Sequence, residues 1–207
     1  MNPTRPIIHV VDDDPSFLKA LSRLLRAGGY IAQTYTSASE FLRRNDPDSH
    51  GCIIVDLRMP DQSGRDLQAR LAKSDSQMPV VFLTGHGDIP TSVRAMRDGA
   101  VDFLTKPVKK RELFSAVERA LARSREESER SARRRELRDR LDALTPREQE
   151  VMRHVIGGQL NKQIAFDLGT SERTIKAHRA SIMDKLGVGS VAELVRFAEK
   201  LGLQPIR

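Results

Sequence analysis

The 207-residue chain has one cysteine, no tryptophan, two tyrosines and no long apolar run. A single cysteine, Cys52, excludes an intramolecular disulfide, and its strand-like surroundings favour packing as a small apolar residue. No run approaches the roughly 18 apolar residues that a membrane span needs. The N-terminus, MNPTRPIIHVVDDD, reads as a strand followed by acids and does not resemble a signal peptide. These absences favour a cytoplasmic protein with no membrane partner.

The charge that is present is mostly positive. The chain is 39% hydrophobic and 30% charged, which is enough apolar material for a core, and its net charge is +7. The last 65 residues carry 10 Lys/Arg against 7 Asp/Glu. This excess suits a nucleic-acid partner, although a solvated basic face produces the same balance.

The first 120 residues alternate between short apolar runs and segments with helical periodicity. Five alternations of this kind predict a doubly wound, five-stranded parallel sheet. Runs that are apolar along their whole length suit strands that are covered on both faces. The predicted strands are residues 7–11, 30–35, 52–55, 80–83 and 100–104, and the five helical segments centre on Leu21, Phe41, Leu67, the pair Val93 and Met96, and Val117.

Residues 122–142, ARSREESERSARRRELRDRLD, differ from the segments on either side. They contain almost no apolar residues, no Gly and no Pro, and they carry three Glu-to-Arg pairs at i,i+4 spacing. The pattern predicts a solvated helix that continues the fifth helix of the sheet domain as a linker. A coiled coil is the alternative, but no heptad of apolar residues is sustained.

The last 65 residues read as four short helices. Thr145, Pro146 and Glu148 form a capping box with proline at the first helical position. Gly157 and Gly158 end that helix, and SVAE at 190–193 predicts a second capping box before the last helix. We therefore expect three parts, an α/β domain at residues 1–121, a helical linker at 122–142 and a small all-α domain at 143–207.

Polar residues follow four of the predicted strands. Asp12 and Asp13 come after the first, Asp56 ends the third, Thr84 ends the fourth and Lys106 follows the fifth. In an open parallel sheet, ligands bind beyond the carboxyl ends of the strands. These groups are therefore expected to converge at one edge, although each alone has an ordinary explanation, such as acids at a helix N-terminus.

Clustered carboxylates with a nearby lysine predict a site for a divalent cation and a phosphoryl group. Repulsion among the acids favours a hard cation with oxygen ligands, Mg²⁺ (or Mn²⁺). We expect Asp13 and Asp56 to be direct ligands, with Asp12 acting directly or through water. Lys106 supplies a second positive charge, so that Asp56 stays ionised and can attack phosphorus. Thr84 offers a hydroxyl donor to the transferred group.

The helix from Ser171 to Lys185 is the candidate for DNA recognition. Its periodicity places Ile175, Ile182 and Leu186 toward the domain core. Lys176 is the first candidate for a base contact in the major groove, and Ala177 lies close enough to touch a thymine methyl. The sequence does not decide whether His178 packs in the core or faces a phosphate. Arg173 and Ala180 share the outward face, and the candidates for phosphate contacts are Lys162, Thr170, Ser171, Thr174, Arg179 and Lys185.

Several motifs carry a resemblance to a known family. VVDDDP, VDLRMPDQSG, VVFLTGHGDI and GAVDFLTKP resemble the receiver domains of two-component response regulators. The sequence LTPREQEVMRHVIGGQLNKQIAFDLGTSERTIKAHRASIMDKLGV resembles a LuxR-type helix-turn-helix, with the motif itself at Asn161 to Ala180. The order and size of the parts are similar to those of the NarL/FixJ class of transcriptional regulators, over nearly the whole chain.

The resemblance implies a flavodoxin-like receiver fold and a role for each site residue. Asp56 is then the phosphoacceptor, Asp12 and Asp13 the acidic pair, and Lys106 the lysine of the site. Thr84 and Phe103 are the switch pair. A backbone carbonyl from Arg58 completes the metal ligands, and a cis bond is expected before Pro107. The implied partners are a sensor histidine kinase, double-stranded DNA, RNA polymerase and a second copy of the chain on phosphorylation, and no enzyme activity is expected.

Two other functions are compatible with parts of the sequence. A Mg²⁺-dependent aspartyl-phosphate phosphatase of the haloacid-dehalogenase kind carries an Asp-x-Asp element after its first strand, which residues 12–14 contain. Asp56 and the C-terminal helices would then lack a purpose. A receiver with an RNA-binding output is the second alternative, and the pattern of the recognition helix argues against it. For the C-terminal part alone, a four-helix domain for protein contacts is a further alternative, and the match to a helix-turn-helix argues against it.

Overall fold

The computed structural model describes residues 5–44, 50–60, 62–73, 78–85 and 96–206. The chain forms two compact units, residues 1–128 and 129–207, and each is described separately below. One long helix, α5 (Lys110–Asp142), contributes residues to both units.

The first unit contains the predicted five-stranded sheet. All neighbouring strands pair in parallel, in the order β2-β1-β3-β4-β5, so the strand order reverses beside β1. This arrangement brings the carboxyl ends of β1 and β3 side by side. The strands are β1 (Ile7–Val11), β2 (Ile31–Tyr35), β3 (Gly51–Asp56), β4 (Val80–Thr84) and β5 (Asp102–Thr105).

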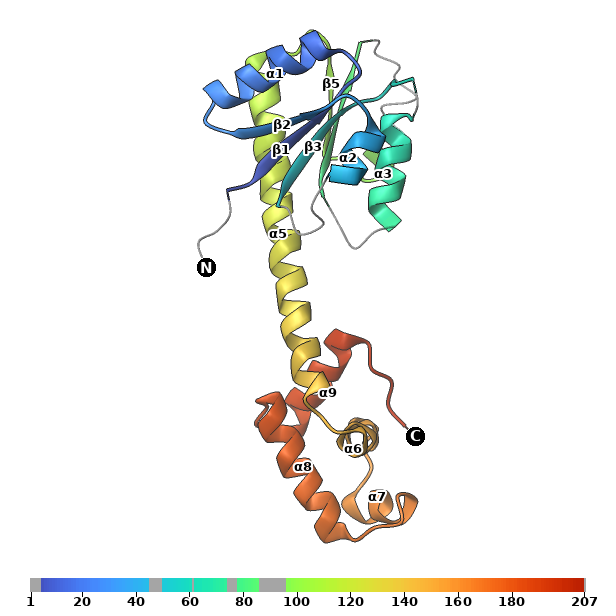
Figure 1. Ribbon diagram of the computed structural model, residues 1–207. Coiled ribbons are helices and arrows are strands. Elements are labelled where there is room, and N and C mark those ends of the chain that lie inside the picture. Colours follow the sequence, from blue (N-terminus) through green and yellow to red (C-terminus); the bar gives the residue numbers. More distant parts are fainter. Residues whose placement is uncertain (1–4, 45–49, 61, 74–77, 86–95, 207) are drawn as a thin grey trace. The chain divides into compact units, whose positions relative to one another are not determined.

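Helices cover both faces of the sheet (Figure 1). Helices α1 (Pro15–Ala27) and α5 pack on one face, and α2 (Ala38–Arg44) and α3 (Gly64–Lys73) on the other. Two apolar clusters result, one on each side, and β3 and β4 are buried along their whole length. The apolar runs of the sequence are therefore explained by burial on both faces.

Apart from the fourth helix, the predicted elements of this unit are confirmed with small shifts. The fifth strand begins two residues later than the apolar run that predicted it, because pairing with β4 starts where Asp102 meets Val81. Of the fourth predicted helix, Val93 lies outside the described residues, whereas Met96 lies in a helical turn.

Local sequence explains where α1 begins and ends. Asp14 is its N-cap and accepts hydrogen bonds from the N–H groups of Ser16 and Phe17. Pro15 occupies the first turn, where a missing N–H is harmless, and Gly28 ends the helix as the sequence predicts. The helix therefore starts directly after the acids that follow β1.

The second unit contains four short helices, as predicted, and it begins at Glu129, inside the predicted linker. Its helices are α6 (Pro146–Ile156), α7 (Asn161–Asp167), α8 (Glu172–Leu186) and α9 (Val191–Leu201). They enclose one apolar cluster, whose fully buried residues include Val151, Ile164 and Ile175. Thr145 and Glu148 form the predicted capping box of α6. The second predicted box is only half formed, because Ser190 caps α9 but Glu193 accepts from the N–H of Gly189.

The linker is the helix that the sequence predicts, and it is anchored in both units. At one end, the hydroxyl of Ser124 accepts a hydrogen bond from the N–H of Gly51, at the start of β3. At the other end, Leu137 and Leu141 pack against the core of the second unit. Ion pairs form at the predicted spacing between Glu129 and Arg133 and between Glu136 and Arg140.

The described helices include none that combines the length and apolar character needed to cross a membrane.

Candidate functional site

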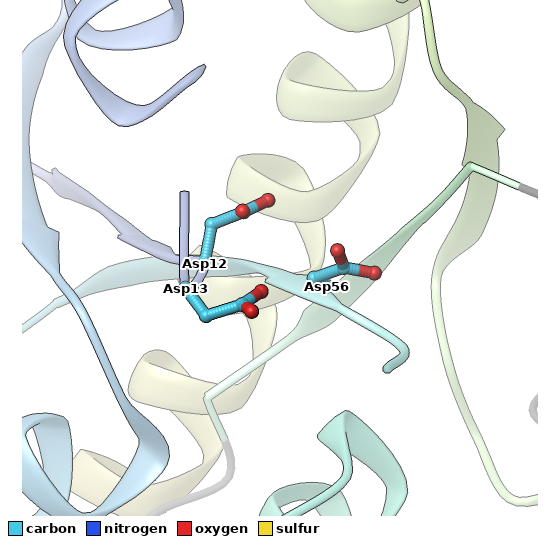
Figure 2. A group of neighbouring side chains, drawn as sticks. All are labelled: Asp12, Asp13 and Asp56. Atoms are coloured by element: carbon cyan, nitrogen blue, oxygen red, sulfur yellow. The ribbon is translucent and has the colours of Figure 1, made fainter. Parts of the chain in front are cut away.

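Three aspartates meet at the carboxyl ends of β1 and β3 (Figure 2). Asp12 and Asp13 follow β1, Asp56 is the last residue of β3, and one carboxylate oxygen from each lies within 4.8 Å of the others. Asp12 is fully buried, Asp56 is nearly so and Asp13 is exposed. The predicted convergence of these acids is therefore present, and it gives a donor set of hard oxygen atoms that suits a divalent cation.

Lys106 reaches the same group of acids from the end of β5. Its ammonium donates hydrogen bonds to the carboxylates of Asp12, at 2.6 Å, and of Asp56, at 2.7 Å. Charge-assisted hydrogen bonds of this kind are stronger than neutral ones. The lysine therefore fixes one oxygen of each of these two carboxylates.

The balance of charge in the pocket favours an additional cation. Burial raises the pKa of Asp12, although its hydrogen bond with Lys106 acts in the opposite direction. Burial also acts to lower the pKa of Lys106, but its bonds to Asp12 and Asp56 outweigh burial, and that pKa is raised. One ammonium among three carboxylates leaves the group with an excess of negative charge, so the residues fit a divalent ion.

Phe17 is part of the pocket and was missed as a site residue in the sequence. The ammonium of Lys106 lies 4.2 Å from the centroid of the Phe17 ring, close enough for a cation–π interaction. In the sequence, Phe17 reads only as one of the apolar positions of α1. No local signal relates it to a lysine 89 positions later, and only the tertiary structure brings the two side chains together.

The loop after β3 holds the carboxylate of Asp56 in place. The N–H of Arg58 donates to an oxygen of Asp56 at 3.2 Å, and the N–H of Gly64 donates to the carbonyl of Leu57 at 3.2 Å. A Cβ atom on Gly64 would lie 2.5 Å from the carbonyl oxygen of Asp56. Glycine is therefore needed for the loop to return this closely to the strand.

Thr84 and Phe103 occupy neighbouring strands next to the pocket. Thr84 is buried at the end of β4, and its carbonyl accepts from the N–H of Lys106 at 2.7 Å. Phe103 pairs in register with Phe82 and is half-buried against the apolar cluster of the α2 and α3 face. The bond between Lys106 and Pro107 is cis, as the resemblance implies.

The outward face of α8 carries the residues that the sequence places there. Arg173, Lys176, Ala177 and Ala180 are exposed. The opposite face is buried, with Ile175, Ile182 and Leu186 in the core as predicted. His178 lies between these faces and is half-buried.

The turn before α8 contains further candidates for phosphate contacts. Ser171 is the N-cap of α8, and its hydroxyl accepts from the N–H of Thr174 at 3.1 Å. Thr170 is half-buried in the same turn, and Lys162 is exposed on α7. These side chains lie on or beside the two helices of the motif, where phosphate contacts are common.

Arg179 and Lys185, both predicted to contact phosphate, make contacts within the domain. Arg179 falls four residues after Ile175 and three before Ile182, so it lies beside the buried face, and its guanidinium donates to the Asn161 side chain at 3.0 Å. The ammonium of Lys185 donates to the Glu148 carboxylate at 2.7 Å. Both cations are therefore engaged in holding α8 to α6 and α7.

Glu148 is a buried acid whose carboxylate accepts three hydrogen bonds. Lys185, Ser181 and the N–H of Thr145 donate to its two oxygens, and the carboxylate closes the capping box of α6. The bond from Lys185, followed by that from Ser181, holds the pKa of Glu148 at about 2. The sequence identified Glu148 as a cap, but not as the residue that attaches α8 to α6.

Two family models match the chain, one over each unit. The model described as "Response regulator receiver domain" matches residues 8–118, and the model described as "Bacterial regulatory proteins, luxR family" matches residues 142–198. A receiver followed by a LuxR-type DNA-binding domain defines a response regulator that controls transcription. The chain belongs to the NarL/FixJ class of response regulators.

Relatives of similar length support this assignment. The response regulator protein TodT of Pseudomonas putida is 42% identical over 201 residues, which cover 97% of this chain and 88% of TodT. The transcriptional regulatory protein FixJ of Bradyrhizobium diazoefficiens is 37% identical over 200 residues, which cover 97% and 98% of the two chains. Among solved structures, the response regulator StyR matches with a TM-score of 0.80 and 44% identity, covering 95% of this chain and all of StyR.

Proposed function

We propose that Asp56 receives a phosphoryl group from a sensor histidine kinase and that this event controls DNA binding by the C-terminal unit. The arrangement of Asp56 between Lys106 and the other acids is the observation that supports it most directly. A carboxylate oxygen of Asp56 attacks phosphorus, the bond from phosphorus to the kinase imidazole breaks, and an acyl phosphate forms. Lys106 neutralises charge on the transferred oxygens.

Asp12, Asp13, Asp56 and the backbone carbonyl of Arg58 are the proposed ligands of Mg²⁺, or of Mn²⁺ in its place. A bound divalent ion would supply positive charge to the phosphoryl oxygens during transfer. The chain contributes the fixed position of Asp56, held by the N–H of Arg58, and the ammonium of Lys106. The excess negative charge of the acid cluster supports this assignment.

Thr84 and Phe103 are the proposed switch. A phosphoryl oxygen on Asp56 accepts a hydrogen bond from the hydroxyl of Thr84, which draws the end of β4 inward, and the Phe103 ring then turns into the space this creates. Its burial is favourable because the ring is apolar. The surface that includes Met96 and Arg97, both exposed in the described structure, then pairs with a second copy of the chain.

The exposed face of α8 is the proposed DNA-reading surface. Lys176 and Ala177 are assigned to base edges, with Arg173 and Ala180 on the same face. Lys162, Thr170, Ser171 and Thr174 are assigned to phosphates. The internal contacts of Arg179 and Lys185 favour structural roles for these two residues. The regulator works in the cytoplasm, where its DNA lies, and acts on transcription through RNA polymerase.

A phosphatase function is less well supported. In that reading Asp12, the first acid of the Asp-x-Asp element, would be the nucleophile. Asp12 is fully buried, and one of its oxygens accepts from Lys106 while the other accepts from the N–H of Asp14. Asp56 retains some exposure, so it is the better nucleophile.

Labelling with a small phosphodonor tests the proposal. Acetyl phosphate with Mg²⁺ should label the wild-type chain and increase its affinity for duplex DNA. Asp56→Asn should lose the label, because its amide cannot attack phosphorus, and Asp14→Asn serves as the control acid outside the cluster. Omission of Mg²⁺ should have nearly the same effect as Asp56→Asn. Undiminished labelling of Asp56→Asn in a phosphoprotein assay would refute the assignment.

A further inference from the structure

The C-terminal turns of α5 pack against the DNA-binding helices and are part of the second unit. Leu137 and Leu141 lie against the core that α6 and α8 help to form. The side chain of Gln149, on α6, donates to the carbonyl of Leu141 at 3.5 Å. The segment that the sequence presents as a solvated linker therefore has one face in contact with the helix-turn-helix.

Arg140 extends this contact to the end of the recognition helix. Its guanidinium donates to the carbonyl of Leu186, the last residue of α8, at 3.4 Å. A second nitrogen of the same guanidinium donates to Glu136 on its own helix. Arg140 is thus oriented by an ion pair within α5 while it contacts α8.

The contact gives a hydrogen-bond donor to the carbonyl of Leu186, which has no partner within the helix. After Leu186 the chain turns at Gly187, whose φ of 63° is in the left-handed region. The N–H groups of Gly187 and Val188 donate to the carbonyls of Asp184 and Met183. The carbonyl of Leu186 lies beyond the reach of that cap, and a positive guanidinium also suits the negative end of the helix dipole.

We infer that Arg140 is a positioning residue for DNA recognition. It holds the C-terminal end of α8 against the linker helix, and so sets the angle at which the outward face of α8 meets the groove. The inference rests on the proposed role of α8 as the DNA-reading helix. It predicts that loss of Arg140 lowers the preference for the selected DNA sequence more than it lowers the affinity for DNA of any sequence.

Arg133 provides a matched control on the same helix. Like Arg140, it forms an i,i+4 ion pair, in this case with Glu129, and both arginines are exposed. Arg133→Ala and Arg140→Ala therefore remove the same charge and the same kind of pair. In the described structure, only Arg140 also donates to α8.

The experiment compares full-length wild type, Arg140→Ala, Arg140→Lys and Arg133→Ala. Each is titrated with a duplex that the wild type selects from a random pool and with a random duplex of equal length, at one salt concentration. For Arg140→Ala, the ratio of the two affinities should fall about three- to tenfold, the size of one helix-terminal contact. Arg133→Ala should keep the wild-type ratio, and Arg140→Lys should recover most of it.

Hydrogen exchange gives a second measurement that does not depend on DNA. The amides of Gly187 and Val188 should exchange faster in Arg140→Ala than in Arg133→Ala, because the end of α8 has lost the contact that holds it to α5. Arg140→Gln, which keeps the aliphatic stem, replaces the alanine variant if that variant fails to fold. Equal affinity ratios and equal exchange for the two alanine variants would overturn the inference. A wild-type chain that selects no sequence would instead contradict the role of α8 itself, and this inference with it.

Discussion

His9 is a buried titratable residue that the proposed phosphoryl transfer does not use. It is 2% exposed in β1, and its Nδ1 lies 3.0 Å from the hydroxyl of Tyr35, which in turn donates to Gln33. Its ring packs against the rings of Tyr35 and Phe41. Within the described structure, the other ring nitrogen has no hydrogen-bond partner. Burial lowers the pKa of His9 to about 4, so the folded receiver keeps this histidine neutral.

The lowered pKa of His9 makes the receiver less stable in acid. Between pH 6.5 and 4 the unfolded chain binds a proton at His9 and the folded chain does not, so the free energy of unfolding falls as the pH falls. At about 1.4 kcal/mol per pKa unit, the loss is roughly 2–3 kcal/mol by pH 4. Urea unfolding followed by tyrosine fluorescence measures it, because both tyrosines, Tyr30 and Tyr35, lie in this unit.

A variant that cannot take the proton isolates this effect from the carboxylates. His9→Phe keeps a ring against Phe41 and should flatten the dependence on pH by the same roughly 2–3 kcal/mol. His50→Gln, at an exposed histidine of the same unit, should retain the wild-type dependence. Identical curves for wild type and His9→Phe between pH 6.5 and 4 would show that His9 does not control acid stability.

At the scale of elements, α8 is held by one face and free on the other. Glu148 on α6, Asn161 on α7 and Arg140 on α5 each accept from or donate to this helix, and all three contacts involve its inner side or its end. The outer side carries the exposed Lys176, which is not one of the residues that hold α8 in the domain. This division separates residues that position α8 from those proposed to read DNA.

Lys176 and Lys162 should therefore differ in what they contribute to DNA binding. Lys176→Ala should cost roughly 1–3 kcal/mol at one base position and relax the preference there, because a contact to a base edge is lost. Lys162→Ala should weaken all sequences alike and reduce the salt dependence of binding by about one unit, because a phosphate contact is lost. Titrations of the selected and random duplexes at several salt concentrations distinguish the two results. If Lys176→Ala weakens both duplexes equally, its assignment to a base is wrong.

At the scale of the whole molecule, phosphorylation acts at a distance only if it favours one of two states. Thr84 is buried at the end of β4, and Phe103, on β5, is only half-buried. The Phe103 ring is therefore the side chain of the two that can become more buried. We expect a chain that is mostly monomeric and that dimerises when Asp56 is phosphorylated, with tighter binding to paired half-sites than to single ones.

Replacement of Thr84 should separate phosphorylation from dimerisation. Thr84→Ala should still accept the label on Asp56, because its hydroxyl does not attack phosphorus, yet it should dimerise poorly. Thr105→Ala is the matched control, since Thr105 is exposed and pairs in register with Thr84 on the neighbouring strand. Sedimentation of the phosphorylated proteins measures the difference. Equal dimerisation of wild type and Thr84→Ala would exclude Thr84 as the transmitter, and a monomeric phosphorylated wild type would refute the dimer model.

The sequence by itself determined the features that depend on neighbouring residues. Runs that are apolar at every position, rather than at alternate ones, predicted parallel strands buried on both faces. The acids that follow two of these runs predicted the carboxylate cluster. Thr145, Pro146 and Glu148 predicted the start of α6, because a cap needs only residues within one turn. The flavodoxin-like receiver fold followed from the family resemblance, and the rule that such sheets bind ligands beyond the strand ends located the site.

The tertiary structure decided which side chains meet across the chain. Phe17 lies over Lys106, and the cations Arg179 and Lys185 turn inward to Asn161 and Glu148. The division of α5 between two units was also decided there, because a solvated helix has the same periodicity whether or not its ends are anchored. These features depend on how whole helices pack, and the charge of a residue does not specify which distant partner it will contact.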